Sequence, residues 1–111
     1  MRILILGGTG LLGRALCAEA KRRGHAPLSA ARVDADYTLD LCEEDALASL
    51  LGKARPVMVI NAAARVDLAA CEADPVRADH INARPLRVLA NWSQHTGQPF
   101  VHISTDHFFD G

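Results

Sequence analysis

Short apolar runs alternate with longer stretches of mixed polarity along the whole chain. Five runs have the length and composition of strands, at residues 3–6, 26–31, 37–39, 57–60 and 100–104. The run at 57–60 is unbroken, which is typical of a strand buried on both faces of a parallel sheet. Strand and helix alternate throughout, so the pattern predicts an α/β fold: a Rossmann-type parallel sheet of about five strands with flanking helices.

The first predicted helix follows a glycine-rich segment and favours helix clearly from Arg14 onwards. Its apolar residues recur at helical spacing and predict one buried face, made of Leu11, Leu12, Ala15, Leu16 and Ala20. Gly24, which follows two arginines, marks its end.

The second predicted helix covers residues 41–53. Asp40 is its predicted N-cap, and Glu43 three residues later completes a capping-box pair. Gly52 and Pro56 are the residues expected to close it.

The third predicted helix runs over residues 74–96. An aspartate followed by a proline, Asp74-Pro75, is a favourable helix start, because the proline in the first turn loses no hydrogen bond there. Pro85 lies inside this helix, so a kink or a break is expected just before it. Gly97 ends the helix.

The glycine-rich turn after the first strand is the strongest chemical signal. Gly7, Gly10 and Gly13 stand between an apolar strand and a helix, which is the context of a dinucleotide-binding turn. Such a turn holds a pyrophosphate on backbone N–H groups at the helix N-terminus. Counted from Gly7 the spacing is Gly-x-x-Gly-x-x-Gly, and counted from Gly8 it is Gly-x-Gly-x-x-Gly, so the subclass stays open. A turn that serves only tight strand–helix packing is the alternative, and the Gly-Lys-Ser/Thr ending of a mononucleotide P-loop is missing.

The end of the second strand reports on the cofactor. An acidic residue there binds a ribose hydroxyl of NAD, whereas an arginine pairs with the 2′-phosphate of NADP. Here the strand ends in Ala30-Ala31-Arg32, which favours NADP(H) and leaves NAD(H) as the alternative. Asp34 competes with Arg32 if the strand runs longer, and Arg32 could equally be an ordinary exposed cation.

Small and polar residues follow the later strands. Ala62, Ala63 and Ala64 come directly after Asn61 and permit close approach of a cofactor, although an alanine-rich loop start explains them equally well. Thr105, at the end of the fifth strand, has a hydroxyl able to donate to a substrate carbonyl, although such hydroxyls often bond to nearby backbone instead. In open parallel sheets, ligands bind beyond these carboxyl ends.

Composition and charge exclude several classes of function. With 111 residues the chain is at most one domain, and its net charge of -1 with one short basic cluster at 21–23 offers no surface for nucleic acid. Three widely spaced cysteines fit neither a disulfide framework nor a zinc site, and the five histidines show no ligand spacing, so no metal is expected. No apolar run approaches the roughly eighteen residues of a membrane span, and the expectation is a cytoplasmic protein.

The chain resembles the extended short-chain dehydrogenase/reductases, most closely the dTDP-4-dehydrorhamnose reductase type. The motifs that carry the resemblance are RILILGGTGLLG at 2–13, DL at 40–41, VINAAA at 59–64, CEADP at 71–75, NA at 82–83 and VHISTD at 101–106, followed by FDG at 109–111. The resemblance implies an NADP-preferring reductase of a nucleotide-linked 4-keto sugar, with a role in rhamnose biosynthesis.

The resemblance also implies roles for individual residues. Gly7, Gly10 and Gly13, with Thr9, Leu11 and Leu12 between them, would hold the pyrophosphate. Asp40 and Leu41 would border the adenine, and Ala62, Ala63 and Ala64 would line the ribose and nicotinamide. Thr105 would be the catalytic hydroxyl that orients and polarises the keto group, before a tyrosine protonates it and a lysine lowers the pKa of that tyrosine.

The sequence departs from the family pattern at its end. No Tyr-x-x-x-Lys follows, so residues 1–111 are expected to be the N-terminal part of a larger doubly wound fold and to be inactive alone. The fifth strand is then an uncovered edge, and the isolated chain is expected to be marginally stable or to associate through that edge. His107 stands where a tyrosine is usual, and residues 65–70 match poorly, which leaves the sugar open. A non-catalytic nucleotide-binding or regulatory subunit, or a nucleotide-sugar epimerase or dehydratase, is the alternative, and homo-oligomerisation is compatible with each.

Overall fold

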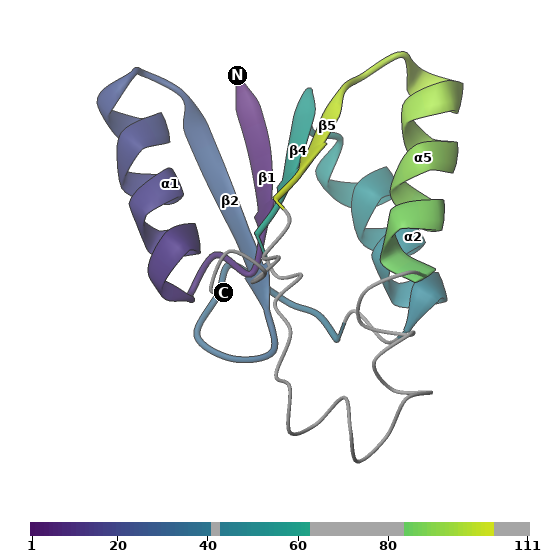
Figure 1. Cartoon of the computed structure of the whole chain (residues 1–111), viewed down its shortest axis with the longest axis horizontal. Helices are drawn as coiled ribbons and strands as arrows, with labels where there is room; N and C mark the ends of the chain where they lie inside the picture. Colours follow the sequence, from purple (N-terminus) through teal and green to yellow (C-terminus); the bar gives the residue numbers. More distant parts are fainter. Residues whose placement is uncertain (41–42, 63–83, 104–111) are drawn as a thin grey trace, which may run out of the picture.

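The sheet contains five parallel strands in the order β3-β2-β1-β4-β5 (Figure 1). The structure is a computed structural model that describes residues 1–40, 43–62 and 84–103. Its elements are β1 (Arg2–Leu6), α1 (Leu11–Arg22), β2 (Ala26–Ala31), β3 (Tyr37–Thr38), α2 (Glu44–Ala54), β4 (Met58–Asn61), α5 (Arg84–Thr96) and β5 (Phe100–His102). The predicted α/β class with a Rossmann-type sheet is confirmed. β5 lies at one end of the sheet, and association through this edge stays a prediction.

The helices form two layers, with α1 on one side of the sheet and α2 and α5 together on the other (Figure 1). β2 and β3 are added to the sheet on one side of β1, and β4 and β5 are added on its other side. Right-handed crossovers in opposite directions place their helices on opposite faces. β1 is therefore covered on both faces, which explains its continuous apolar sequence.

The main core lies between the sheet and the α2–α5 layer. Alternate residues of β1, Leu4 and Leu6, meet Leu47 of α2 and Leu89 of α5 in one cluster, and all four side chains are fully buried. The intervening residues of β1 face the opposite side, toward α1. Each fully buried leucine contributes roughly 1.5–3 kcal/mol to folding.

The buried face of α1 differs from the prediction. The helix begins at Leu11, three residues before the clearly helical segment, and its buried residues are Gly13 and Ala20. Leu11 is 93% exposed, Leu12 is 43% exposed and Ala15 is exposed as well, so the prediction that these three face the core is wrong. The helix instead lies on its smallest residues, which let its backbone come close to the sheet.

The start and end of α2 also differ from the prediction. Glu43, not Asp40, occupies the N-cap position, and it forms no side-chain capping bond. Asp40 contributes its backbone carbonyl, which accepts a hydrogen bond from the Glu43 N–H at 3.0 Å. Gly52 lies inside the helix, which ends when Arg55 adopts the left-handed conformation at φ 49°.

The third helix, α5, is described from Arg84 onwards, and the residues directly before it, where a kink or a break was expected, lie outside the described residues. The predicted start at 74–75 and the loop before it lie outside the described residues. Gly97 follows the helix at φ 75°, and its N–H donates to Ser93, which confirms the predicted stop.

Candidate functional site

The carboxyl ends of all five strands lie along one edge of the sheet. Backbone hydrogen bonds join neighbouring strand ends one after another across that edge. These are Leu39 N–H to Ala31 O at 2.8 Å, Gly7 N–H to Ala30 O at 2.8 Å, Ala62 N–H to Leu6 O at 2.9 Å and Ile103 N–H to Asn61 O at 3.1 Å. The glycine turn after β1 is thereby placed at the centre of the edge.

The glycines of this turn serve different structural purposes. Gly7 has a φ of 78°, which a residue with a side chain rarely adopts, and its carbonyl accepts the Gly10 N–H at 3.1 Å. A Cβ on Gly8 would meet the Cβ of Ser29 on β2 at 2.5 Å, and a Cβ on Gly13 would meet the Gly7 carbonyl oxygen at 2.0 Å. These three glycines are required by the fold itself.

Gly10 is different, because nothing in the described structure requires a glycine there. It is exposed, it has φ −74° and ψ 174°, and it is the N-cap residue of α1. A Cβ on it would meet only the Gly7 oxygen, at an ordinary contact distance of 3.5 Å. The first turn of α1 receives no side-chain cap at this residue and contains no acidic side chain, so its N–H groups can bind an anion.

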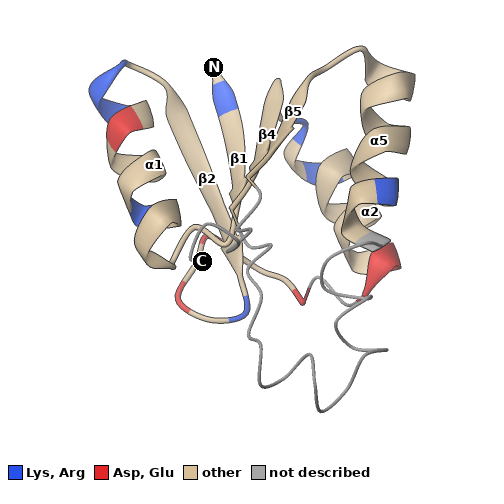
Figure 2. Ribbon diagram, viewed as in Figure 1, with Lys and Arg blue, Asp and Glu red and all other residues tan. Residues whose placement is uncertain are grey.

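A groove of about 860 Å³ extends from the glycine turn between α1 and the loop after β2. We call it the α1–β2 groove; its polar lining consists of Thr9, Arg14, Cys17, Lys21, Ser29, Asp34 and Asp36. Figure 2 shows both signs of charge on the loop after β2 and cationic positions along α1. The groove therefore connects the glycine turn with the loop after β2.

One wall of the groove is held by a reciprocal contact. The Asp36 carboxylate accepts hydrogen bonds from the Ser29 N–H at 2.9 Å and from its hydroxyl at 3.2 Å, and the Ser29 hydroxyl in turn accepts the Asp36 N–H at 2.9 Å. These bonds tie the loop after β2 back to the middle of that strand. Burial raises the pKa of the Cys17 thiol in the same groove, and Asp36 raises it further, so this cysteine is no thiolate nucleophile at neutral pH.

The two residues predicted to contact the adenosine ribose, Arg32 and Asp34, lie in different surroundings. Arg32 follows β2 and is exposed, and it does not line the α1–β2 groove. Asp34 does line it, in a left-handed conformation at φ 54°. Asp40 is half-buried after β3.

At the ends of β4 and β5, a buried asparagine lies beside a half-buried histidine. Asn61 is only 1% exposed, and its side-chain nitrogen lies 3.4 Å from Nδ1 of His102 on β5. Ala62 follows directly and is half-buried. Four of the predicted site residues, Leu41, Ala63, Ala64 and Thr105, lie outside the described residues.

The sequence did not predict that Arg14, Ser29 and Asp36 contribute to the groove. Arg14 directly follows the last glycine and lies in the first turn of α1, where the helix dipole disfavours a cation. This unfavourable position is the feature of the sequence that could have indicated a role for Arg14. The Ser29–Asp36 contact leaves no recognisable pattern, because it depends on the path of the loop. Over the described ranges, no group of three or more His, Cys, Asp or Glu side chains is arranged to hold a metal, and no helix there is long and apolar enough to cross a membrane.

Comparison with known proteins identifies the family. The model of the family described as RmlD substrate binding domain matches residues 1–111. The chain belongs to this family. Among curated members of similar sequence, the dTDP-4-dehydrorhamnose reductase of Burkholderia thailandensis is 38% identical over 112 residues, covering 100% of this chain and 36% of that enzyme. The reductase of the same name from Escherichia coli is 34% identical over 115 residues, with the same two coverages.

Solved structures of RmlD-type reductases share the fold described above. A hypothetical dTDP-4-dehydrorhamnose reductase from Sulfolobus tokodaii superposes with a TM-score of 0.86 at 36% identity, covering 100% of this chain and 41% of that one. The Bacillus anthracis reductase, in complex with NADP, has a TM-score of 0.77 at 27% identity and covers 93% of this chain and 35% of its own. The chain thus spans little more than a third of the length of these relatives, and the resemblance to dTDP-4-dehydrorhamnose reductases is confirmed.

Proposed function

We propose that residues 1–111 form the dinucleotide-binding domain of an NADP-preferring reductase that acts on a nucleotide-linked 4-keto sugar. The observation that carries the proposal is Gly10, an exposed glycine at the N-cap of α1 that the fold does not require. A glycine at a position where a side chain would fit is explained by a ligand whose pyrophosphate approaches the backbone closely. The names of the Burkholderia and Escherichia relatives, and the NADP bound to the Bacillus enzyme, support the choice of reaction and cofactor.

The proposed roles follow the strand ends. The N–H groups of the first turn of α1, at Leu11 and Leu12, would bind the pyrophosphate, with Gly7 and Gly13 allowing the turn to close. Asp40 and Leu41 would border the adenine. Ala62, Ala63 and Ala64 would leave room for the ribose and nicotinamide.

The bound dinucleotide would supply a hydride to the sugar. Thr105 would donate a hydrogen bond to the keto oxygen and so favour the negative charge that develops on it. The proton donor and its lysine would come from a Tyr-x-x-x-Lys pair, which residues 1–111 do not contain. The reaction is therefore proposed for a polypeptide that joins this domain to such a pair.

The binding part is tested by titrating the chain with NADPH. Gly10→Ala is expected to weaken binding at least about tenfold, because the new methyl group occupies the space of a phosphate oxygen. Gly52→Ala is the matched control: this glycine is exposed within α2, nothing lies within 4 Å of its missing Cβ, and binding is expected to be unchanged. If the wild-type chain does not bind NADPH, the proposal is wrong.

The reductase part is tested with the tyrosine and lysine present, by following NADPH oxidation that depends on a nucleotide-linked 4-keto sugar. Oxidation that Thr105→Val reduces strongly would support the assigned chemistry. Tight NADPH binding without any such oxidation would instead favour a non-catalytic nucleotide-binding subunit.

A further inference from the structure

Two arginines, Arg14 and Arg32, are candidates for binding the adenosine end of the proposed dinucleotide. Arg32 has the position expected from sequence, directly after β2, but it does not line the α1–β2 groove. Arg14 does line it, together with Thr9 of the glycine turn and Asp34 of the loop after β2. In an open parallel sheet, a dinucleotide on the glycine turn extends its adenosine ribose toward the neighbouring strand end, and the loop after β2 forms one wall of this groove through Val33, Asp34 and Asp36.

The side chain of Arg14 is held in place over the turn. Its Nε donates a hydrogen bond to the Thr9 carbonyl oxygen at 3.0 Å. Within the described ranges its two terminal nitrogens have no hydrogen-bond or ion-pair partner, so they remain available to an anion. A guanidinium fixed by one nitrogen and open at the other two has the fork geometry that binds phosphate in a bidentate manner.

The location of Arg14 is unfavourable without a ligand. A cation in the first turn of a helix opposes the helix dipole, and no acidic side chain in that turn of α1 compensates it. A bound phosphate would reverse this, because it would pair with the arginine and also interact favourably with the helix N-terminus. The first turn of α1, with Arg14 in it, therefore favours binding of an anion.

The two carboxylates that line the groove, Asp34 and Asp36, differ in how strongly they would repel a bound phosphate. Asp36 is engaged by the N–H and hydroxyl of Ser29, so its charge is already partly satisfied. Asp34 remains the carboxylate that would oppose a phosphate. Lys21 lies seven residues after Arg14, about 10 Å further along the helix axis and away from the glycine turn.

We propose that Arg14, rather than Arg32, binds the adenosine 2′-phosphate of NADP and sets the preference for NADP over NAD. This inference rests on the proposed function, because it assumes that a dinucleotide occupies the glycine turn. Arg14 and Thr9 form the phosphate-reading end of the groove, and Asp34 limits how strongly NADP is preferred.

The test is calorimetric titration of the full chain with NADP+ and with NAD+, which differ only in that phosphate. Arg14→Gln is expected to weaken NADP+ binding about 10- to 100-fold and to change NAD+ binding less than about threefold. Lys21→Gln removes the same charge from the same groove and is the matched control; together with Arg32→Gln it is expected to leave the ratio of the two affinities within about threefold. Asp34→Asn is expected to raise the ratio in favour of NADP+.

The outcomes separate the inference from the proposed function. If NAD+ and NADP+ bind and Arg14→Gln leaves their ratio unchanged, Arg14 is not the phosphate-binding residue, although the domain still binds a dinucleotide. If Arg32→Gln lowers the ratio instead, Arg32 has that role and the inference is overturned. If the wild-type chain binds neither dinucleotide, the proposed function fails, and the inference with it. Thermal unfolding of each variant confirms that the exposed substitutions leave the fold intact.

Discussion

The backbone of Gly13 lies against the backbone of Gly7, so closely that a Cβ on Gly13 would come within 2.0 Å of the Gly7 carbonyl oxygen. The same Cβ would lie 2.7 Å from the Gly8 Cα. These neighbours are backbone atoms, which cannot rotate away as a flexible side chain could. Helix α1 can begin directly after the turn only because residue 13 has no side chain.

Gly13→Ala is therefore expected to destabilise the chain by about 3 kcal/mol, even though alanine is the better helix former by about 1 kcal/mol. Gly10→Ala, three residues earlier, meets no close atom and is expected to cost less than about 1 kcal/mol, as an N-cap substitution. Urea unfolding of the two variants measures both values. Equal stabilities of the two variants would contradict the distinct roles assigned to these glycines.

Gly8 and Ser29 provide a second close contact that can be tested by a double-mutant cycle. A Cβ on Gly8 would lie 2.5 Å from the Ser29 Cβ, so Gly8→Ala is expected to cost about 1–3 kcal/mol. Ser29→Gly removes that Cβ together with the hydroxyl bonded to Asp36, and it is destabilising alone. In the double variant the clash is relieved, so we expect a favourable coupling of about 1 kcal/mol or more. Additive effects would show that the turn moves away from β2 instead.

The strands are the part of the fold that sequence predicts well, because a strand buried on two faces must be apolar along its length. The second strand occupies Ala26–Ala31, as predicted, and the run at 57–60 is displaced by one residue to Met58–Asn61. Helix faces are predicted less well. The periodicity of α1 cannot distinguish a leucine that faces the sheet from one such as Leu11, which is exposed.

The sequence predicts the parts of the candidate site that are formed by the backbone at the strand ends. The order of strands brings Gly7, Ala62 and Asp40 to the same edge, because parallel strands share the direction of their carboxyl ends. Which of the two arginines, Arg14 or Arg32, lines the α1–β2 groove was not predictable. It depends on the path of the loop after β2, where Asp34 adopts a left-handed conformation that its sequence does not demand.

Leu11 and Leu47 make the distinction between a site residue and a core residue measurable. Leu47 is fully buried between α2 and the sheet, so Leu47→Ala is expected to destabilise the chain by about 2–5 kcal/mol. Leu11 is 93% exposed, and Leu11→Ala is expected to change stability by no more than about 0.5 kcal/mol. Leu11 is proposed to bind the pyrophosphate through its backbone N–H, which alanine keeps, so Leu11→Ala tests the packing of the side chain without removing that contact. A large loss of stability in Leu11→Ala would show that it packs in the protein interior.

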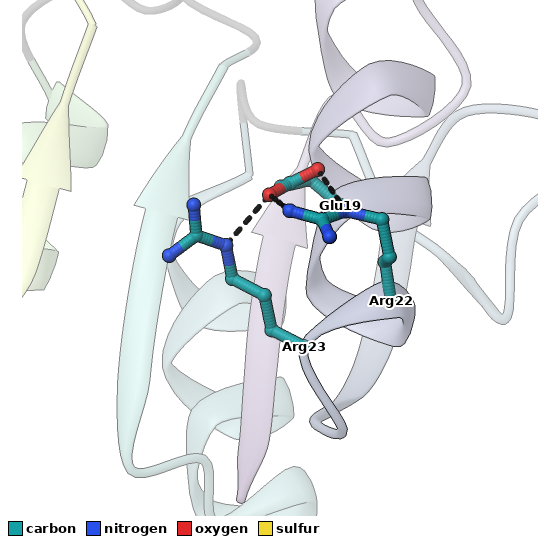
Figure 3. A network of polar contacts seen from close by, with 3 residues as sticks. All are labelled: Glu19, Arg22 and Arg23. Carbon is teal, nitrogen blue, oxygen red and sulfur yellow. Dashed lines mark hydrogen bonds and ion pairs between the residues drawn. The ribbon is translucent and has the colours of Figure 1, made fainter.

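The charged residues at the end of α1 predict a pH dependence of stability (Figure 3). Glu19 accepts hydrogen bonds from Arg22 at 2.6 and 3.0 Å and from Arg23 at 2.6 Å, and these bonds lower the pKa of its carboxyl from 4.5 to about 2.

Between about pH 4.5 and pH 2, the Glu19 carboxylate takes up a proton in the unfolded chain but not in the folded chain. The contribution of Glu19 to stability is therefore complete above about pH 4.5 and is lost as the pH falls toward 2. The difference in unfolding free energy between wild type and Glu19→Gln should therefore be constant from pH 8 to about 5 and disappear by about pH 2. It should be small and should shrink in 1 M NaCl, because water and salt screen exposed ion pairs. NMR titration of Glu19 provides the independent check, and a pKa near 4.5 would show that the arginines do not hold the carboxylate in solution.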